Sequence, residues 1–124
     1  MDERATPHNC GMTYRNLRVL AAAEEVVVEV VRLFDEPRPR RRRLLFKAQT
    51  LGCAESVPRN IGEALGRQTI ADRNRVLGIA CGEAEETIRH LEANLSANRL
   101  DERSHSSLHD RLVAIITMLK SLIN

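Results

Sequence analysis

Residues 14–35 read YRNLRVLAAAEEVVVEVVRLFD, and this stretch decides the fold. Its apolar residues recur at spacings of three and four, which is the period of an α-helix. Thr13 stands directly before the stretch, where its side chain can accept a hydrogen bond from the first turn. Pro37 and Pro39 follow its end and cannot continue a helix. The sequence therefore predicts a first helix from Tyr14 to Asp35.

This helix has more apolar surface than one seam of a helical bundle needs. One stripe contains Leu17, Leu20, Glu24, Val27, Val31 and Phe34. A neighbouring stripe contains Val19, Ala23, Val26, Val30 and Leu33. We expect the helix to pack both on its own bundle and on another subunit. The predicted oligomer interface contains Val26, Val27, Val28, Val30 and Val31.

The same spacing of apolar residues predicts three more helices. The second covers Leu44–Leu65 and contains Pro58. The third begins after Thr69, which is expected to cap it, and ends near Asn98. The fourth begins after Asp101. Its apolar stripe contains Leu108, Leu112, Ile115, Ile116, Leu119, Leu122 and Ile123.

The composition agrees with a single helical domain. Of the 124 residues, 43% are hydrophobic and 2% are aromatic, and the chain contains six glycines and four prolines. These turn-forming residues are too few for a β-sandwich or barrel, and the length leaves no room for two cores. Short links between helices favour antiparallel neighbours. We predict an all-α protein, an antiparallel up-down four-helix bundle at residues 13–124, after a disordered tail at residues 1–12.

Cysteine usage and hydropathy indicate the compartment. Cys10, Cys53 and Cys81 are odd in number and form no CxxC pair, which argues against a secreted disulfide framework. No apolar run approaches the length of about 18 residues that a transmembrane helix needs. The first residues also lack the apolar segment of a signal peptide. We expect a cytoplasmic protein without a membrane partner.

The densest charge of the chain lies between the first two predicted helices. Residues 38–43 read RPRRRR, whereas the whole chain nearly balances 19 basic against 17 acidic residues. Arginine presents a planar fork of donors that matches phosphate oxygens. No aromatic residue within the run offers base stacking, so recognition would be weakly sequence-specific. We predict that RNA or DNA binds to Arg38, Arg40, Arg41, Arg42 and Arg43; the other interpretation is a solvated loop that maintains solubility or meets an acidic partner.

Residues 49–63 read QTLGCAESVPRNIGE and resemble the signature of the bacterial four-helix bundle protein family, first met as proteins encoded in intervening sequences of 23S ribosomal RNA genes. Residues 14–17 and 79–82 resemble two further motifs of that family. The matching positions, to which the resemblance gives a structural role, are Gln49, Ser56, Pro58, Asn60, Ile61, Glu63, Gly82 and Glu86. The chain departs from the family pattern at residues 40–43, which are usually acidic.

The resemblance implies a fold and an assembly rather than an activity. Members of the family are four-helix bundles, known relatives assemble as rings of five subunits, and most have no established biochemical function. Related accessory variability proteins of diversity-generating retroelements are basic and bind nucleic acid. We expect no cofactor, because the sequence contains no cofactor motif, and the resemblance implies a homopentamer. Its arginine runs would form a basic collar around the ring, where multivalency strengthens binding.

The polar residues around Pro58 admit a catalytic and a structural interpretation. As a nucleophile, Ser56 would need a base, and no histidine is positioned as one by the sequence. Proline leaves a helix carbonyl without its donor, and the side chains of Ser56 and Asn60 can satisfy such a group. We favour the structural role. Glu63 and Glu86 are expected to pair with arginines between helices or subunits.

Two other patterns contain residue types that can carry chemistry. His105 and His109, four residues apart, could hold a metal ion, but the sequence fixes no third ligand and we predict no metal site. Whether this pair ever binds metal stays open, and His90 gives no specific signal. The glycine pairs lack the flanking residues of a phosphate loop, so we interpret them as points where helices cross closely. These pairs are Gly62 with Gly66 and Gly78 with Gly82.

Without a catalytic triad, metal cage or cofactor motif, the sequence does not predict an enzyme. The function that it favours is that of a non-enzymatic homo-oligomer, a pentamer, whose arginine-rich loop binds RNA or DNA. The alternative is a protein–protein interaction scaffold that binds no nucleic acid.

Overall fold

The structure, a computed structural model, describes residues 13–123, so the predicted tail at residues 1–12 lies outside it. Its four α-helices are α2 (Tyr14–Asp35), α3 (Lys47–Leu65), α4 (Ile70–Ser96) and α5 (Glu102–Leu122). A short 3-10 helix, η1 (Arg40–Arg42), lies between α2 and α3. The described residues contain no strand, which confirms the predicted all-α class.

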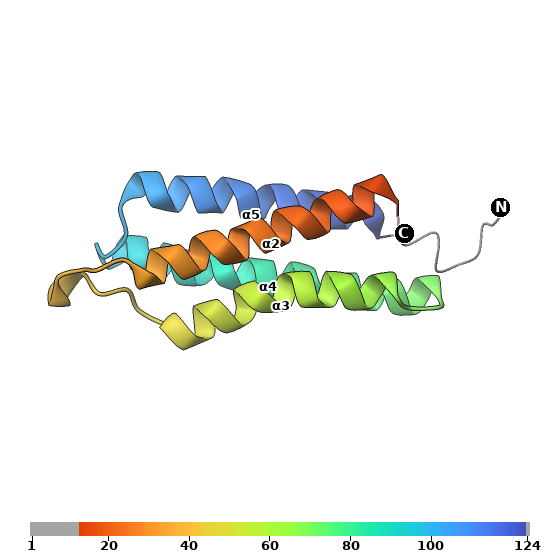
Figure 1. Ribbon diagram of the computed structural model, residues 1–124, viewed down its shortest axis with the longest axis horizontal. Coiled ribbons are helices and arrows are strands. Elements are labelled where there is room, and N and C mark those ends of the chain that lie inside the picture. Colours follow the sequence, from red (N-terminus) through yellow and green to blue (C-terminus); the bar gives the residue numbers. More distant parts are fainter. Residues whose placement is uncertain (1–12, 124) are drawn as a thin grey trace.

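The four helices form one bundle (Figure 1). Helix α2 packs against α3 and α5, and α4 packs against the same two helices, so α2 and α4 are diagonal to each other. The colours of Figure 1 show that each helix runs opposite to the one before it. The α2–α3 connection with η1 and the α4–α5 link therefore lie at one end of the bundle. The start of α2 and the end of α5 lie at the other end.

Three helix starts are capped by the side chains that the sequence predicted as caps. Thr13 Oγ1 accepts a hydrogen bond from the Asn16 amide at 3.2 Å, and Thr69 Oγ1 accepts one from the Asp72 amide at 3.1 Å. Asp101 caps α5 in the same way. These bonds satisfy amides that have no partner inside the helix, which explains why α2 starts where predicted.

Helix α3 starts three residues later than predicted. Phe46, directly before it, has a left-handed backbone (φ 63°), and no side chain caps the helix. The prediction of Leu44 as the first helical residue was wrong because this residue belongs to the connection and contributes to the core. Its side chain is buried although its backbone is not helical.

The core consists of aliphatic side chains from all four helices. The largest fully buried ones include Ile61 from α3, Leu77 and Leu91 from α4, and Leu112 and Ile115 from α5. Full burial of one such side chain contributes about 1.5–3 kcal/mol to stability. Core packing therefore supplies the main stabilisation of a chain that has few aromatic residues.

Replacing Asp101 by Ala is expected to lower the free energy of unfolding by about 1 kcal/mol, because the start of α5 loses its cap. The Asp101 carboxylate accepts a hydrogen bond from the Ser104 amide at 2.9 Å. That bond holds the pKa of Asp101 below its ordinary value of 3.8. A lowered pKa gives stability that is present above pH 3.8 and is lost as the pH falls further.

Urea unfolding of the wild type, Asp101→Ala and Asp101→Asn from pH 7 to pH 3 measures both effects. Asn keeps the cap without a titrating group, so Asp101→Asn should be nearly as stable as the wild type at pH 7 and lose less stability in acid. Equal stability of Asp101→Ala and wild type at pH 7 would show that the cap contributes little.

Candidate functional site

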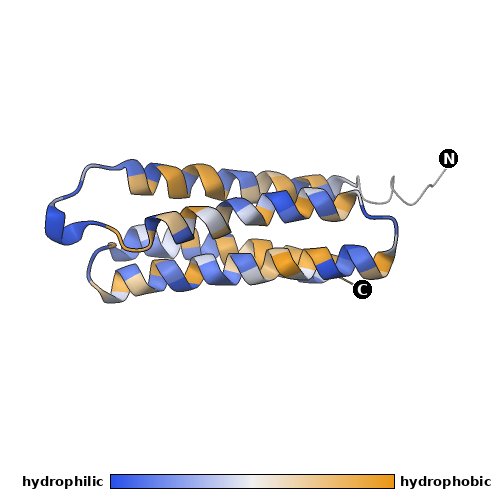
Figure 2. Ribbon diagram, turned by 90° about the horizontal axis from the view of Figure 1, so that it is seen from below, coloured by the Kyte–Doolittle hydropathy of each residue, from blue (hydrophilic) through white to orange (hydrophobic). Residues whose placement is uncertain are grey.

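The arginine segment, residues 38–43, is held at its base and exposed at its tip. At the base, Arg38 Nη1 donates to the Arg99 carbonyl at 2.9 Å, and Arg99 Nη1 donates to the Arg43 carbonyl at 2.8 Å. At the tip, η1 extends beyond the ends of the helices (Figure 1). In Figure 2 the ribbon of this tip has the colour of hydrophilic residues.

The five arginines of this segment are therefore not equivalent. The side chain of Arg38 is only 16% exposed and lies 3.5 Å from the Glu36 carboxylate. Arg40, Arg41, Arg42 and Arg43 are exposed, and within residues 13–123 no carboxylate forms an ion pair with any of them. The exposed side chains are free to meet a polyanion, whereas Arg38 also joins the segment to the α4–α5 link.

A buried asparagine fixes the segment to the bundle. Asn94 of α4 is fully buried, and its amide side chain accepts from the Leu45 amide at 2.7 Å and donates to the Leu45 carbonyl at 3.1 Å. Both backbone groups of Leu45 lie outside any helix and need partners because they lie beside the core. The sequence analysis missed Asn94, since nothing near it in the chain marks a contact with residue 45.

The predicted oligomer interface on α2 divides between the core and the surface. Val26 and Val30 are 2% and 0% exposed inside their own bundle, so their assignment to a contact between subunits was wrong. Val27 is half-buried, and Val28 and Val31 are 48% and 37% exposed. Together with Leu17, which is 45% exposed, Val28 and Val31 define an outer stripe along α2.

Glycines do not mark helix crossings within the subunit, contrary to the prediction. Apart from chain neighbours and the nearby backbone of its own helix, a Cβ atom at Gly62, Gly78 or Gly82 would meet no described atom within 4 Å, and one at Gly66 would make only an ordinary contact with its own helix end. All four residues are exposed. Glycine inside a helix costs about 1 kcal/mol relative to alanine, and packing within this bundle does not offset that cost.

The polar residues around Pro58 have a structural arrangement. Pro58 lies inside α3, as predicted, and its missing amide would have bonded the Ala54 carbonyl. The Asn60 side chain instead donates to the Ser56 carbonyl and to Ser56 Oγ, each at 2.8 Å. The expectation that Asn60 would serve the carbonyl freed by proline was therefore wrong. Ser56 is buried and Asn60 is half-buried.

The remaining motif residues occupy α3 and α4. Ile61 is fully buried in the core, and Gln49 is exposed in the first turn of α3. Glu63 pairs with Arg67 at 2.9 Å, and Glu86 pairs with Arg89 and His90 of its own helix. These acidic residues do not form the predicted pairs between helices within the described chain.

Between α3 and α4 the structure brings together a cysteine, a histidine and a glutamate that the sequence analysis did not connect. Cys53 Sγ lies 3.7 Å from His90 Nδ1, and His90 Nε2 lies 3.2 Å from the Glu86 carboxylate. Thr87 Oγ1 donates to Cys53 Sγ at 3.1 Å, and the ring of Phe46 stacks on His90. The order resembles a thiol–imidazole–carboxylate relay.

The state of Cys53 argues for a structural role of this cluster. The residue is buried, and burial, with the nearby Glu83 and Glu86 carboxylates, raises the pKa of its thiol. A reactive thiol needs the opposite, a lowered pKa and access to substrate. Cys53 and His90 are 37 positions apart in the sequence, so no local pattern could have predicted the contact.

The paired histidines of α5 stack with ring centroids 5.5 Å apart, and His109 Nδ1 lies 3.5 Å from the Asp110 carboxylate. Among residues 13–123, no group of three or more histidine, cysteine, aspartate or glutamate side chains is placed to hold a metal ion. Over the same range, no helix has the length and apolar character to cross a membrane.

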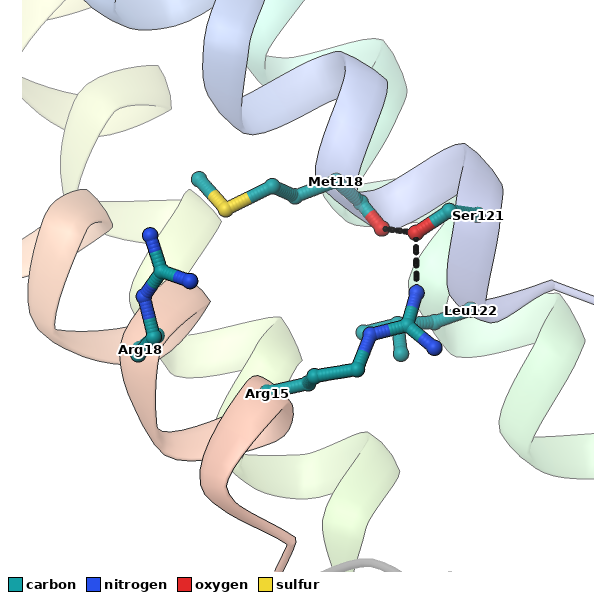
Figure 3. Close-up of a pocket in the computed structure, with 5 residues that line it drawn as sticks. All are labelled: Arg15, Arg18, Met118, Ser121 and Leu122. Atoms are coloured by element: carbon teal, nitrogen blue, oxygen red, sulfur yellow. Dashed lines mark hydrogen bonds between the residues drawn. The ribbon is translucent and has the colours of Figure 1, made fainter.

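The far end of the bundle has a small pocket between α2 and α5 (Figure 3). Arg15 and Arg18 of α2 face Met118, Ser121 and Leu122 of α5 across about 70 Å³. Arg15 donates to Ser121 Oγ at 2.7 Å, and Ser121 donates to the Met118 carbonyl at 2.7 Å. These bonds join the first turn of α2 to the last turn of α5. The lining offers no acid or base for catalysis.

Fold and surface together define a class of protein: a helical bundle with an exposed basic loop at one end. The chain belongs to the family of 23S rRNA-intervening sequence proteins, whose model matches residues 15–121, as the resemblance at residues 49–63 predicted. A similar solved structure is that of a protein of unknown function from the S23 ribosomal protein family of Bacteroides thetaiotaomicron. That chain is 27% identical, with a TM-score of 0.80, over 88% of this chain and 97% of its own length. No curated protein matches the sequence.

Proposed function

We propose that the protein is a cytoplasmic, non-enzymatic homo-oligomer, a ring of five subunits, that binds RNA or DNA through its arginine segment. The observation that carries this proposal is the exposed tip of the segment. Arg40, Arg41 and Arg42 extend beyond the helices without a carboxylate partner in residues 13–123. Each arginine that neutralises a phosphate releases counterions, which favours binding without sequence preference.

Assembly would multiply this charge. A single loop offers few phosphate contacts, but several loops on one ring face act on the same strand at high effective concentration. The outer stripe of α2, formed by Leu17, Val28 and Val31, is an apolar surface that a second subunit would cover. The exposed helix glycines support the same arrangement, since they permit close approach of another backbone.

Binding to a labelled mixed-sequence RNA and to a DNA duplex across a salt series tests the proposal. Log affinity is expected to fall linearly with log salt concentration. The triple variant Arg40→Ser, Arg41→Ser and Arg42→Ser should lower the steepness of this fall for DNA by about 2–3, if each arginine meets one phosphate. Anisotropy titrations from low to physiological salt give both affinity and slope.

A control variant removes the same charge elsewhere. Arg18, Arg59 and Arg111 are exposed on α2, α3 and α5, and changing all three to Ser should leave the slope close to that of the wild type. If both triple variants lower the salt slope equally, binding depends on net charge alone and not on where the arginines lie. If neither nucleic acid binds at low salt, the alternative function, a protein–protein interaction scaffold, replaces this one.

A further inference from the structure

A pocket lies beneath the arginine segment. Its lining combines arginines of that segment with charged side chains from outside it. It has a volume of about 240 Å³ and is lined by Phe34, Glu36, Arg38, Arg43, Leu44 and Lys47. Three of these side chains are cationic and one is anionic, so the lining has a net charge of +2 (3 − 1). Lys47 is the first residue of α3 and lies outside the arginine run.

Arg38 gives this pocket a fixed donor. Its guanidinium is held by the Arg99 carbonyl at 2.9 Å, and its side chain is only 16% exposed. Its Nε atom is buried and has no hydrogen-bond partner among the described residues. Buried donors without acceptors are rare in folded proteins, and an anion in the pocket would supply an acceptor beside Arg38.

The start of α3 adds to the positive potential. No side chain caps this helix, and its first turn contains no acidic residue. The amides of the first turn have no intrahelical partner, and the helix dipole is positive at this end. A lysine side chain at the positive end of a helix dipole is unfavourable unless an anion lies nearby. The presence of Lys47 at the start of α3 therefore favours an anion-binding site.

We propose that this pocket binds one phosphate group through Arg38, Arg43 and Lys47, and that the group is a phosphodiester of the bound nucleic acid. The second part rests on the proposed function above. Arg40, Arg41 and Arg42 attract the polyanion over a distance, while the pocket holds a single phosphate and thereby sets the position of the strand.

Equilibrium dialysis of the full-length protein against radiolabelled orthophosphate, at ionic strength fixed with chloride, tests the first part. The wild type should bind one phosphate per subunit. Lys47→Gln and Arg43→Gln should each weaken binding tenfold or more, whereas Arg41→Gln, the same charge change at the tip, should change it less than twofold. Circular dichroism shows whether each variant keeps its fold.

The same variants with labelled RNA test the second part. Lys47→Gln should weaken RNA binding more than Arg41→Gln does at equal net charge. The proposed pocket is overturned if the wild type binds no phosphate. It is also overturned if Lys47→Gln, Arg43→Gln and Arg41→Gln weaken phosphate binding equally. Both conclusions hold even if RNA binds. Phosphate binding without binding of either RNA or the DNA duplex supports the pocket as a site for a free phosphate and refutes the proposed function.

Discussion

Replacing Val31 by Glu is expected to convert the proposed oligomer into folded monomers, whereas replacing Val30 by Glu is expected to unfold the chain. Val31 belongs to the outer stripe and is 37% exposed, so a carboxylate there stays hydrated in a monomer and is buried only in an assembly. Val30 is fully buried. An unpaired carboxylate at that position would cost about 4 kcal/mol or more, a large part of a typical stability of about 5–15 kcal/mol.

Light scattering coupled to size exclusion gives the mass of each variant, and circular dichroism gives its helix content. Val28→Glu should behave as Val31→Glu does. Val113→Glu is the matched control, because Val113 is an equally exposed apolar residue (42%) on α5. If Val113→Glu dissociates the assembly and Val31→Glu does not, the interface lies on α5. A monomeric wild type would exclude the assembly altogether.

Local signals predicted the fold well because helix starts and periods are local properties. Thr13, Thr69 and Asp101 bond amides three residues away, so a short stretch of sequence contains all the information. The start of α3 could not be predicted in this way. Leu44 is apolar and has the right spacing, but its burial depends on packing against distant parts of the bundle, and its backbone leaves the helix.

The choice between the two stripes of α2 also depends on tertiary structure. Val30 and Val31 are adjacent and chemically identical, so periodicity alone cannot say which one faces the core and which one faces outward. The candidate site, too, could be predicted only in part from the sequence, because its contacts depend on tertiary structure. The arginine run is visible in the sequence, but the burial of Arg38, the inclusion of Lys47 in the pocket and the contact of Cys53 with His90 require the bundle.

Replacing Asn94 by Ala is expected to lower the free energy of unfolding by about 2–4 kcal/mol. The change leaves the amide and carbonyl of Leu45 without their partners, and an unsatisfied buried polar group costs about 1–3 kcal/mol. Because Leu45 lies between Arg43 and Lys47, the arginine segment should also lose its fixed position. Urea unfolding measures the first effect, and the rate of tryptic cleavage at residues 40–43 measures the second.

Asn60→Ala separates this role from the general effect of removing an asparagine. Both side chains donate to the carbonyl four residues earlier in their own helix, His90 for Asn94 and Ser56 for Asn60. Asn60 holds no segment outside a helix, so Asn60→Ala should cost about 1 kcal/mol or less and leave cleavage unchanged. If Asn94→Ala and Asn60→Ala lower the free energy of unfolding equally, the bonds to Leu45 contribute little. A larger loss at Asn94, with faster cleavage, would show that one buried amide fixes the basic loop to the bundle.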